Sequence, residues 1–234
     1  MSTIQLVVFD IAGTTVRDKG NVAGSFIEAF QHFGLEVPEE DVKKVMGFRK
    51  IEAIQILLNK FYPGYKDPKH TTDELIGEIH ARFVATMVSF YENDRELEPL
   101  THTEDVFSQL KQQGVKIALN TGFTRTITNA ILHRLNWDNG SSLIDRVICS
   151  DEVPQGRPSP DMINTLIAEL GISSAAHVLK IGDTEVDVEE GRNAGCGKVV
   201  SVTTGAYTRE QLETYHPDYI IDDLEELLSI IAKA

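Results

Sequence analysis

The chain has 234 residues, 41% of them hydrophobic and 25% charged, and a formal net charge of -14 with its 7 His counted as neutral. This length is enough for a substantial core and a smaller second domain. The acidic balance argues against nucleic acid and against an anionic membrane as partners. An anionic substrate would need local cations or a bound metal to reverse the field in its site.

Features that would direct the chain to a membrane or to secretion are missing from the sequence. Its first residues lack a basic and apolar signal pattern, and no apolar run reaches membrane length. Cys149 and Cys196 each lie beside apolar residues, so we expect small core side chains in a reducing compartment rather than a disulfide. We therefore expect a soluble, cytoplasmic protein.

The first strong structural signal is the apolar, β-branched run 6–9, which ends abruptly at Asp10. Small residues and the hydroxyls of Thr14 and Thr15 follow it. This pattern predicts a buried parallel strand that delivers Asp10 to a tight, phosphate-sized loop. In open parallel sheets, ligands bind just beyond the carboxyl ends of the strands. The simpler alternative is that Asp10 only caps the next turn.

Residues 21–90 have helical periodicity and no convincing strand. One helical face carries Phe26, Phe30 and Phe33, and a second predicted helix, interrupted near Gly47, carries Val45, Ile51, Ile54, Leu57 and Leu58. A third carries Leu75, Ile79, Phe83 and Met87. An insertion after an active-site strand is usually a cap over the site. We therefore predict a helical cap at 17–95 and a core formed by 1–16 and 96–234.

An alternation of strands and helices resumes near Pro99. We predict strands at 115–119, 146–150, 178–181, 199–202 and 219–221. The predicted helices are 106–112, 127–135, 160–170, 186–194, 209–214 and 224–231. This alternation is typical of an α/β fold with a doubly wound parallel sheet and right-handed crossovers.

Polar groups follow four of the predicted strands. They are Asp10, Thr121, Arg157, and the pair Asp183 and Asp187. In a parallel sheet all four groups would meet at one rim. A carboxylate nucleophile, a hydroxyl, a fixed cation and an acid pair that binds a metal suit phosphoryl transfer to Asp10. Each group also has a structural alternative, such as a helix cap or a surface ion pair.

These residues resemble a known family. Asp10-Ile11-Ala12-Gly13-Thr14, Thr121, Arg157, and Gly182-Asp183-Thr184 through Asp187 are similar to the four ordered motifs of the haloacid dehalogenase superfamily. The resemblance implies a Rossmann-like core with a cap and a Mg²⁺-dependent hydrolase with Asp10 as its nucleophile. It also implies roles for the other motif residues. Mg²⁺ would be held by Asp10, the Ala12 carbonyl and Asp183, supported by Asp187, and substrate oxygens by Thr121, Arg157, Gly13, Thr14 and Gly122.

Two positions narrow the resemblance to the phosphonatases, which cleave the C–P bond of phosphonoacetaldehyde. Most phosphatases of the superfamily have a general acid where this chain has Ala12, and a Lys where it has Arg157. Ala12 cannot protonate an alkoxide, but a carbon leaving group stabilised as an enamine needs less help.

The cap segment 45–51 is similar to the one that supplies the phosphonatase Schiff-base lysine, with Lys50 at that position and Met46 beside the nucleophile. Burial and Arg49 would lower the pKa of Lys50. Alternatively, Lys50 is one more solvated lysine beside Lys43 and Lys44.

Three positions depart from the bacterial phosphonatases: Ala53 replaces a His, Phe123 a Tyr and Gly20 a Cys. Two other functions therefore stay open. One is a small-molecule phosphomonoesterase, similar to phosphoglycolate phosphatase, and the other is a phosphate-sensing or partner-binding module without activity. The resemblance also implies a homodimer joined through the cap, for which the apolar helix at about 22–33 is the predicted contact.

Overall fold

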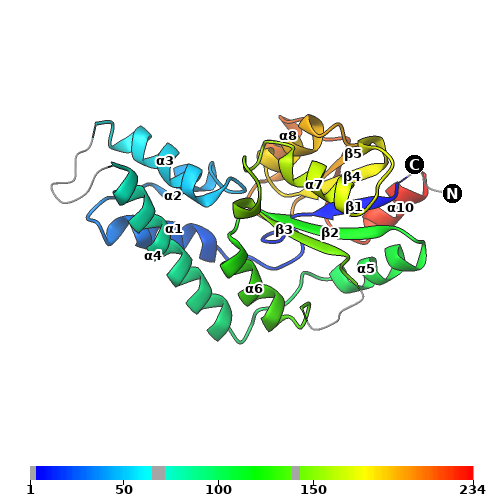
Figure 1. Cartoon of the computed structure of the whole chain (residues 1–234), viewed down its shortest axis with the longest axis horizontal. Helices are drawn as coiled ribbons and strands as arrows, with labels where there is room; N and C mark the ends of the chain where they lie inside the picture. The colour runs from blue at the N-terminus through cyan, green and yellow to red at the C-terminus, as the bar shows by residue number, and fades with distance from the viewer. Residues whose placement is uncertain (1–3, 65–71, 139–142, 234) are drawn as a thin grey trace.

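The computed structural model describes residues 4–64, 72–138 and 143–233. A six-stranded sheet forms its centre, in the order β3-β2-β1-β4-β5-β6, and every neighbouring pair is parallel (Figure 1). The strands are β1 (Leu6–Phe9), β2 (Lys116–Thr121), β3 (Arg146–Cys149), β4 (Val178–Gly182), β5 (Lys198–Val202) and β6 (Tyr219–Ile221). The predicted parallel α/β fold is confirmed.

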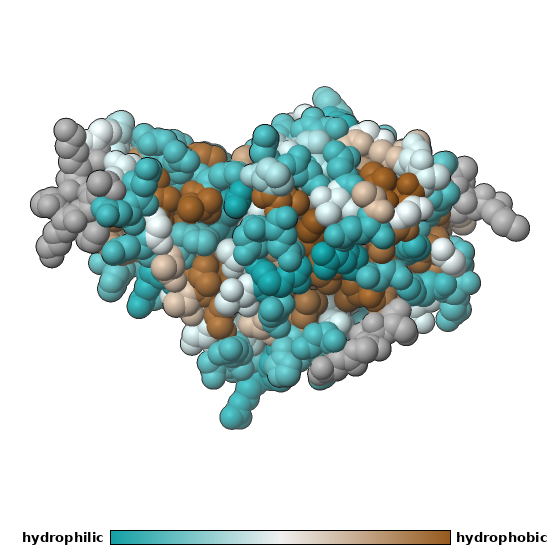
Figure 2. Space-filling model, viewed as in Figure 1, coloured by the Kyte–Doolittle hydropathy of each residue, from teal (hydrophilic) through white to brown (hydrophobic). Residues whose placement is uncertain are grey.

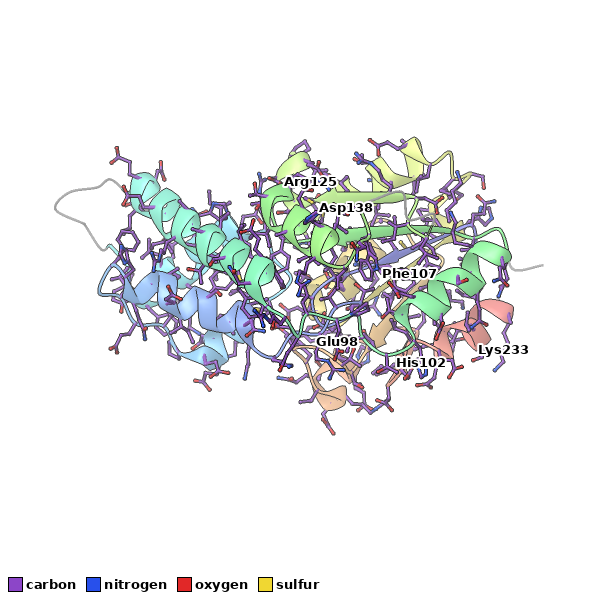
Figure 3. The ribbon with its side chains drawn as sticks, turned by 90° about the horizontal axis from the view of Figure 1, so that it is seen from below. Glu98, His102, Phe107, Arg125, Asp138 and Lys233 are labelled. Atoms are coloured by element: carbon purple, nitrogen blue, oxygen red, sulfur yellow. The ribbon has the colours of Figure 1, made fainter. Side chains whose placement is uncertain are left out.

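Helices cover both faces of this sheet because its strands are apolar on both sides. Phe9 packs against Phe107 of α5 (Thr103–Gln112), with ring centroids 4.9 Å apart, and Figure 3 views this face. The same hydrophobic cluster includes residues of α6 (Arg125–Arg134) and α10 (Glu226–Ala232). On the opposite face, Leu6 and Val8 lie in a cluster with residues of α7 (Asp161–Glu169). The core also contains α8 (Glu185–Asn193) and α9 (Arg209–Glu213), and 3-10 turns at Ser150–Glu152 and Ala175–His177.

Four helices inserted after β1 form the cap beyond one end of the sheet (Figure 1). They are α1 (Asn21–Gln31), α2 (Glu39–Lys43), α3 (Lys50–Phe61) and α4 (Thr72–Asn93). Within the cap, α1 packs on α4, with the rings of Phe26 and Phe83 4.4 Å apart. Phe26 and Phe30 have no exposed surface. The apolar face of α1 is thus covered inside the same chain, whereas Gly24, Glu28 and Gln31 of the helix are exposed. A homodimer, and a contact through α1, stay predictions.

Local glycine geometry explains one difference between the predicted and observed cap helices. Val45, which we predicted in a helix with Ile51, lies in a turn after the short helix α2. Gly47 has a φ of 84°, a left-handed conformation that ends regular helix. The long helix therefore starts only at Lys50.

The exposed surface and the two cysteines agree with what the composition predicts. The face in Figure 2 is largely hydrophilic, with apolar residues visible in smaller areas. Among the described helices, none combines the length and the apolar character needed to cross a bilayer. Cys149 is buried and Cys196 half-buried, and both are free thiols, as predicted. Burial raises the pKa of each to about 12, so both thiols stay protonated near neutral pH.

Candidate active site

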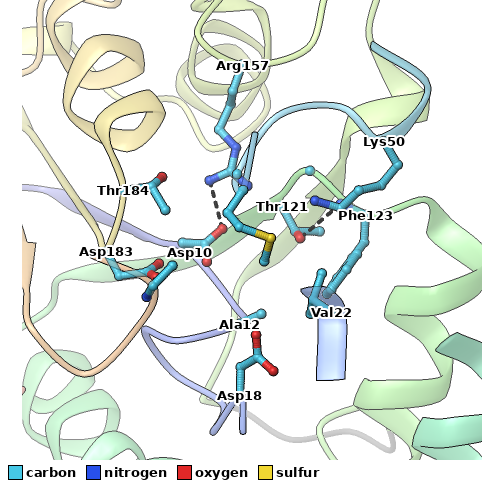
Figure 4. A pocket seen from close by; sticks show the side chains of 14 residues that line it. Asp10, Ala12, Asp18, Val22, Lys50, Thr121, Phe123, Arg157, Asp183 and Thr184 are labelled. Atoms are coloured by element: carbon cyan, nitrogen blue, oxygen red, sulfur yellow. Dashed lines mark hydrogen bonds and ion pairs between the residues drawn. The ribbon is translucent and has the colours of Figure 1, made fainter. Parts of the chain in front are cut away.

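A small pocket between cap and core collects the predicted catalytic side chains (Figure 4). Asp10 follows β1, Thr121 ends β2 and Lys50 begins α3, and all three line the pocket with Arg157 and Asp183. Ala12, Met46 and Gly122 also line it. The open space is about 20 Å³, room for roughly one water molecule. The cap is therefore closed over the carboxyl ends of the central strands.

Asp10 and Arg157 form the buried ion pair at the centre of this pocket. Arg157 Nη1 lies 2.7 Å from Asp10 Oδ1, and the two residues are 1% and 5% exposed. Burial raises the pKa of Asp10, although the positive charge of Arg157 opposes the rise. The Nε of Arg157 is buried and has no hydrogen-bond partner among the described residues. An anionic oxygen in the pocket could satisfy that donor.

Asp183 is the second carboxylate in the pocket. Its Oδ1 accepts a hydrogen bond from Thr14 Oγ1 at 3.2 Å, and its Oδ2 accepts one from the Ala206 amide at 2.7 Å. A Cβ at Gly13 would lie 2.7 Å from Asp183 Oδ2, so only glycine fits there. Burial and the negative charge of Asp10 raise the pKa of Asp183 well above its usual value. Gly13 and Thr14 thus support Asp183 in this structure, and neither lines the pocket.

Asp187, predicted to support a metal, has both carboxylate oxygens engaged by the chain. Oδ2 accepts from the amide and hydroxyl of Thr184, at 3.2 and 2.6 Å. Oδ1 lies 2.5 Å from Arg157 Nη1 and 2.9 Å from Lys180 Nζ. Burial opposes ionisation, but the Lys180 and Arg157 cations outweigh it and hold the pKa of Asp187 at about 2. Asp187 is therefore an anchor for Arg157.

Lys50 reaches the pocket from the cap and is only 3% exposed. Its Nζ donates to the Phe48 carbonyl at 3.2 Å and lies 5.7 and 5.1 Å from the ring centroids of Phe26 and Phe123. Burial, followed by the positive charge of Arg157, lowers the pKa of Lys50 to about 8. The alternative that Lys50 is a solvated surface lysine is wrong.

Arg49, which we predicted to lower the pKa of Lys50, is not among the main causes of that shift. It contacts the core, where its Nη1 donates to the Pro154 carbonyl at 3.2 Å. Among the cations near Lys50, Arg157 is therefore the one with the larger effect on the pKa.

Backbone contacts hold the loop before Lys50 against the core. A Cβ on Gly47 would lie 2.3 Å from Val186 Cγ2, and one on Gly122 would lie 2.4 Å from the Phe48 carbonyl oxygen. Neither site can accept a side chain without moving the cap. Gly122, predicted to bind substrate, therefore also allows the cap loop to approach.

One of the three departures from the phosphonatase pattern places an aromatic ring against the Lys50 amine. Ala53 is fully buried on α3, and Phe123 presents its ring to Lys50. Gly20 is exposed at the start of α1. No polar side chain replaces the missing groups at these three positions.

Two charged residues of the site were missed by sequence reasoning. Asp18 lines the pocket, but its Oδ1 also accepts from the Gly20 and Asn21 amides, at 3.0 and 2.8 Å. An aspartate just before a helix is usually an N-cap, so the sequence offers no reason to place Asp18 in the pocket. Lys180 is buried in β4. In the sequence, its only distinguishing feature was that it is a single lysine inside an apolar run.

Comparison with known proteins agrees with this geometry. A family model of haloacid dehalogenase-like hydrolases matches residues 4–195. The chain is 29% identical to a phosphonoacetaldehyde hydrolase of Paraburkholderia phytofirmans, covering 99% of this chain and 95% of that protein. It is 31% identical to one of Bacillus mycoides, covering 95% and 86%.

A longer relative and two solved structures extend the comparison. A bifunctional phosphonoacetaldehyde hydrolase/aminoethylphosphonate transaminase of Clostridioides difficile is 32% identical over 98% of this chain, which spans 36% of that protein. The crystal structure of a phosphonoacetaldehyde hydrolase-like protein from Oleispira antarctica has a TM-score of 0.82 at 22% identity, covering 99% and 92%. That of a predicted phosphoglycolate phosphatase from Haemophilus somnus has a TM-score of 0.77 at 21% identity, covering 98% and 99%.

The structural similarities establish the fold alone. The family match covers most of the chain and contains Asp10, Thr121, Arg157 and Asp183 in their expected order. This protein is a hydrolase that belongs to the haloacid dehalogenase-like family.

Proposed function

We propose that this hydrolase cleaves the C–P bond of phosphonoacetaldehyde or a related small phosphonate with a carbonyl group. The observation that carries the proposal is the position of Lys50, a buried amine whose pKa is lowered to about 8 in the same closed pocket as Asp10. Relatives named phosphonoacetaldehyde hydrolase, 29% to 31% identical over nearly the whole chain, support it.

The pocket fits a divalent cation such as Mg²⁺. Asp10 and Asp183 are both buried, and burial raises the pKa of each carboxyl, an effect that a bound cation would oppose. Hard oxygen ligands of this kind, with a backbone carbonyl such as that of Ala12, are what Mg²⁺ prefers. Within the described ranges, no group of three or more His, Cys, Asp and Glu side chains is placed to hold a metal ion, so the carbonyl is needed to complete the set. Bound there, Mg²⁺ would reduce the repulsion between Asp10 and the substrate anion.

In the proposed reaction, Lys50 first activates the substrate carbonyl. Its neutral amine adds to the carbonyl carbon, and water leaves as the imine forms. Protonation of the imine nitrogen makes an electron acceptor two bonds from phosphorus. Arg157, with its unpaired Nε, and the Thr121 hydroxyl would hold the phosphonyl oxygens.

Asp10 then attacks phosphorus. As the new O–P bond forms, the C–P bond breaks and its electron pair enters the enamine on Lys50. Water hydrolyses the aspartyl phosphate to inorganic phosphate, and the enamine takes a proton on carbon before water releases the aldehyde. Because carbon leaves as an enamine, the step needs no acid at the position of Ala12.

Borohydride trapping tests the imine directly. With phosphonoacetaldehyde and Mg²⁺, borohydride should inactivate the enzyme and add the mass of the reduced adduct to the peptide that contains Lys50. Lys50→Ala should lose both trapping and phosphate release, by at least about a thousandfold in rate. Lys43→Ala is the matched control, because Lys43 is an exposed cap lysine paired with Glu39.

The alternatives predict different results in a phosphate-release screen. Full activity of Lys50→Ala on phosphonoacetaldehyde would contradict the proposed mechanism. Activity of the wild-type enzyme on phosphate esters alone would establish the phosphomonoesterase, and no turnover of any compound would favour a binding module.

A further inference from the structure

We propose that Lys180, held by Glu190 and Asn120, is a positioning residue that acts through Asp187 to place Arg157 for the phosphoryl group. The inference rests on the proposed function only in requiring that the pocket bind a phosphoryl or phosphate anion. It is independent of whether carbon or oxygen is the leaving group.

Lys180 lies inside the protein, on the strand next to β1. Lys180 is 0% exposed, and it pairs in register with Val8, which lies two residues before Asp10. A Cβ on Gly191 of α8 would lie 3.0 Å from Lys180 Cβ, so the lysine stem runs between β4 and α8. An ammonium group buried in an apolar strand is costly unless every proton finds an acceptor. Its presence there calls for a complete set of partners.

The partners of Lys180 form a closed network. Its Nζ donates to Asn120 Oδ1 at 2.8 Å and lies 2.9 Å from Asp187 Oδ1 and 3.4 Å from Glu190 Oε2. Asn120 Nδ2 lies 2.8 Å from each oxygen of Glu190. Three acceptors match the three ammonium protons. The orientation of the amine toward Asp187 is therefore fixed from two other sides.

The network reaches the site through one shared oxygen. Asp187 Oδ1 contacts Lys180 and Arg157, and Arg157 Nη1 bridges Asp187 and Asp10. With Lys180 present, part of the negative charge of Asp187 is balanced away from the pocket. Without it, Arg157 would be the remaining cation against Asp187 Oδ1 among the described residues, and Asp187 would bind it more tightly. The guanidinium would then be less available to a substrate anion, which also needs it.

Binding of inorganic phosphate to the whole enzyme in the presence of Mg²⁺ tests this role. Lys180→Met should weaken phosphate binding in calorimetry about tenfold or more and raise KM by a similar factor. The double variant Lys180→Met/Glu190→Gln removes the opposite buried charge as well. It should recover thermal stability but not phosphate affinity. Lys116→Met is the control, since Lys116 starts the adjacent strand β2 at the end far from the site and bonds to the Leu170 carbonyl.

The outcomes separate positioning from a purely structural role. If Lys180→Met is folded and binds phosphate like the wild-type protein, the inference is overturned. It is also overturned if the double variant regains both phosphate affinity and thermal stability, because the weaker binding of Lys180→Met would then result from its loss of stability. If Lys180→Met does not fold, the Glu190→Gln variant is used in its place. Unchanged phosphate affinity in Glu190→Gln then overturns the inference. Failure of the wild-type protein itself to bind phosphate would also overturn the inference, whereas the proposed C–P cleavage is decided separately by the Lys50 trapping experiment.

Discussion

The Lys50 amine lies over the ring of Phe123, with Nζ 5.1 Å from the ring centroid. Phe123 belongs to the core and Lys50 to the cap, so this contact joins the two at the Lys50 amine. An aromatic face stabilises the ammonium form, whereas burial disfavours it. Burial has the larger effect, and the pKa of Lys50 is lowered to about 8.

This lowered pKa predicts the pH dependence of the reaction. The amine is protonated and unreactive below about pH 8 and neutral above it. The logarithm of kcat/KM should therefore rise with unit slope toward that pH and then level off. Phosphate release and borohydride trapping, each measured across the range, should follow the same curve. A rate that falls between about pH 7 and pH 9 would contradict the role of Lys50 as an amine nucleophile.

Asp10→Asn should separate catalysis from stability. Loss of the nucleophile should lower turnover at least about a thousandfold. The raised pKa of Asp10 means that ionisation is less favourable in the folded state than in the unfolded state, so the charge destabilises the fold above its ordinary pKa. The neutral variant should therefore melt at the same temperature or higher at neutral pH. A clear loss of Tm in a thermal scan would show that the ion pair with Arg157 dominates instead.

Removal of divalent ions should abolish activity, and Mg²⁺ should restore it. Since a cation would offset the repulsion between Asp10 and Asp183, Mg²⁺ should also raise Tm. An ion concentration of about 100 times Kd corresponds to about 2.7 kcal/mol. Asp183→Asn should lose most of this increase in a thermal shift assay. An identical Mg²⁺-dependent shift in that variant would place the ion elsewhere.

Gly47→Ala should impair closure of the cap. The new Cβ would lie 2.3 Å from Val186 Cγ2, so the cap loop must move away and take Lys50 with it. We expect kcat/KM to fall about tenfold or more. Gly34→Ala is the matched control, because Gly34 also has a positive φ, 70°, but has no neighbour within 4 Å of a new Cβ. It should lose about 1 kcal/mol of stability and keep its activity. Equal loss of activity in both variants would refute the role of the Gly47 contact.

Much of this site could be predicted from local patterns. An apolar strand that ends at an acid or a hydroxyl places that group at the sheet rim, and the alternation of strands and helices makes the rims coincide. Asp10, Thr121 and Asp183 follow directly from this rule, and the structure brings all three to one pocket. The motif around Lys50 predicted which of the three lysines in the segment 43–50 lines the pocket.

Other features depend on contacts between distant residues and leave little trace in the chain. The pKa of Lys50 depends on burial and on Arg157, more than 100 residues away. The apolar face of α1 could have faced a partner or the rest of the cap, and only packing against α4 decides between them. The sequence by itself determined which chemical groups reach the rim, because strand periodicity and loop position are local properties. Only the tertiary structure decided their charge states and partners, as with Lys180 behind Asp187, because burial and Coulomb interactions depend on distances in space.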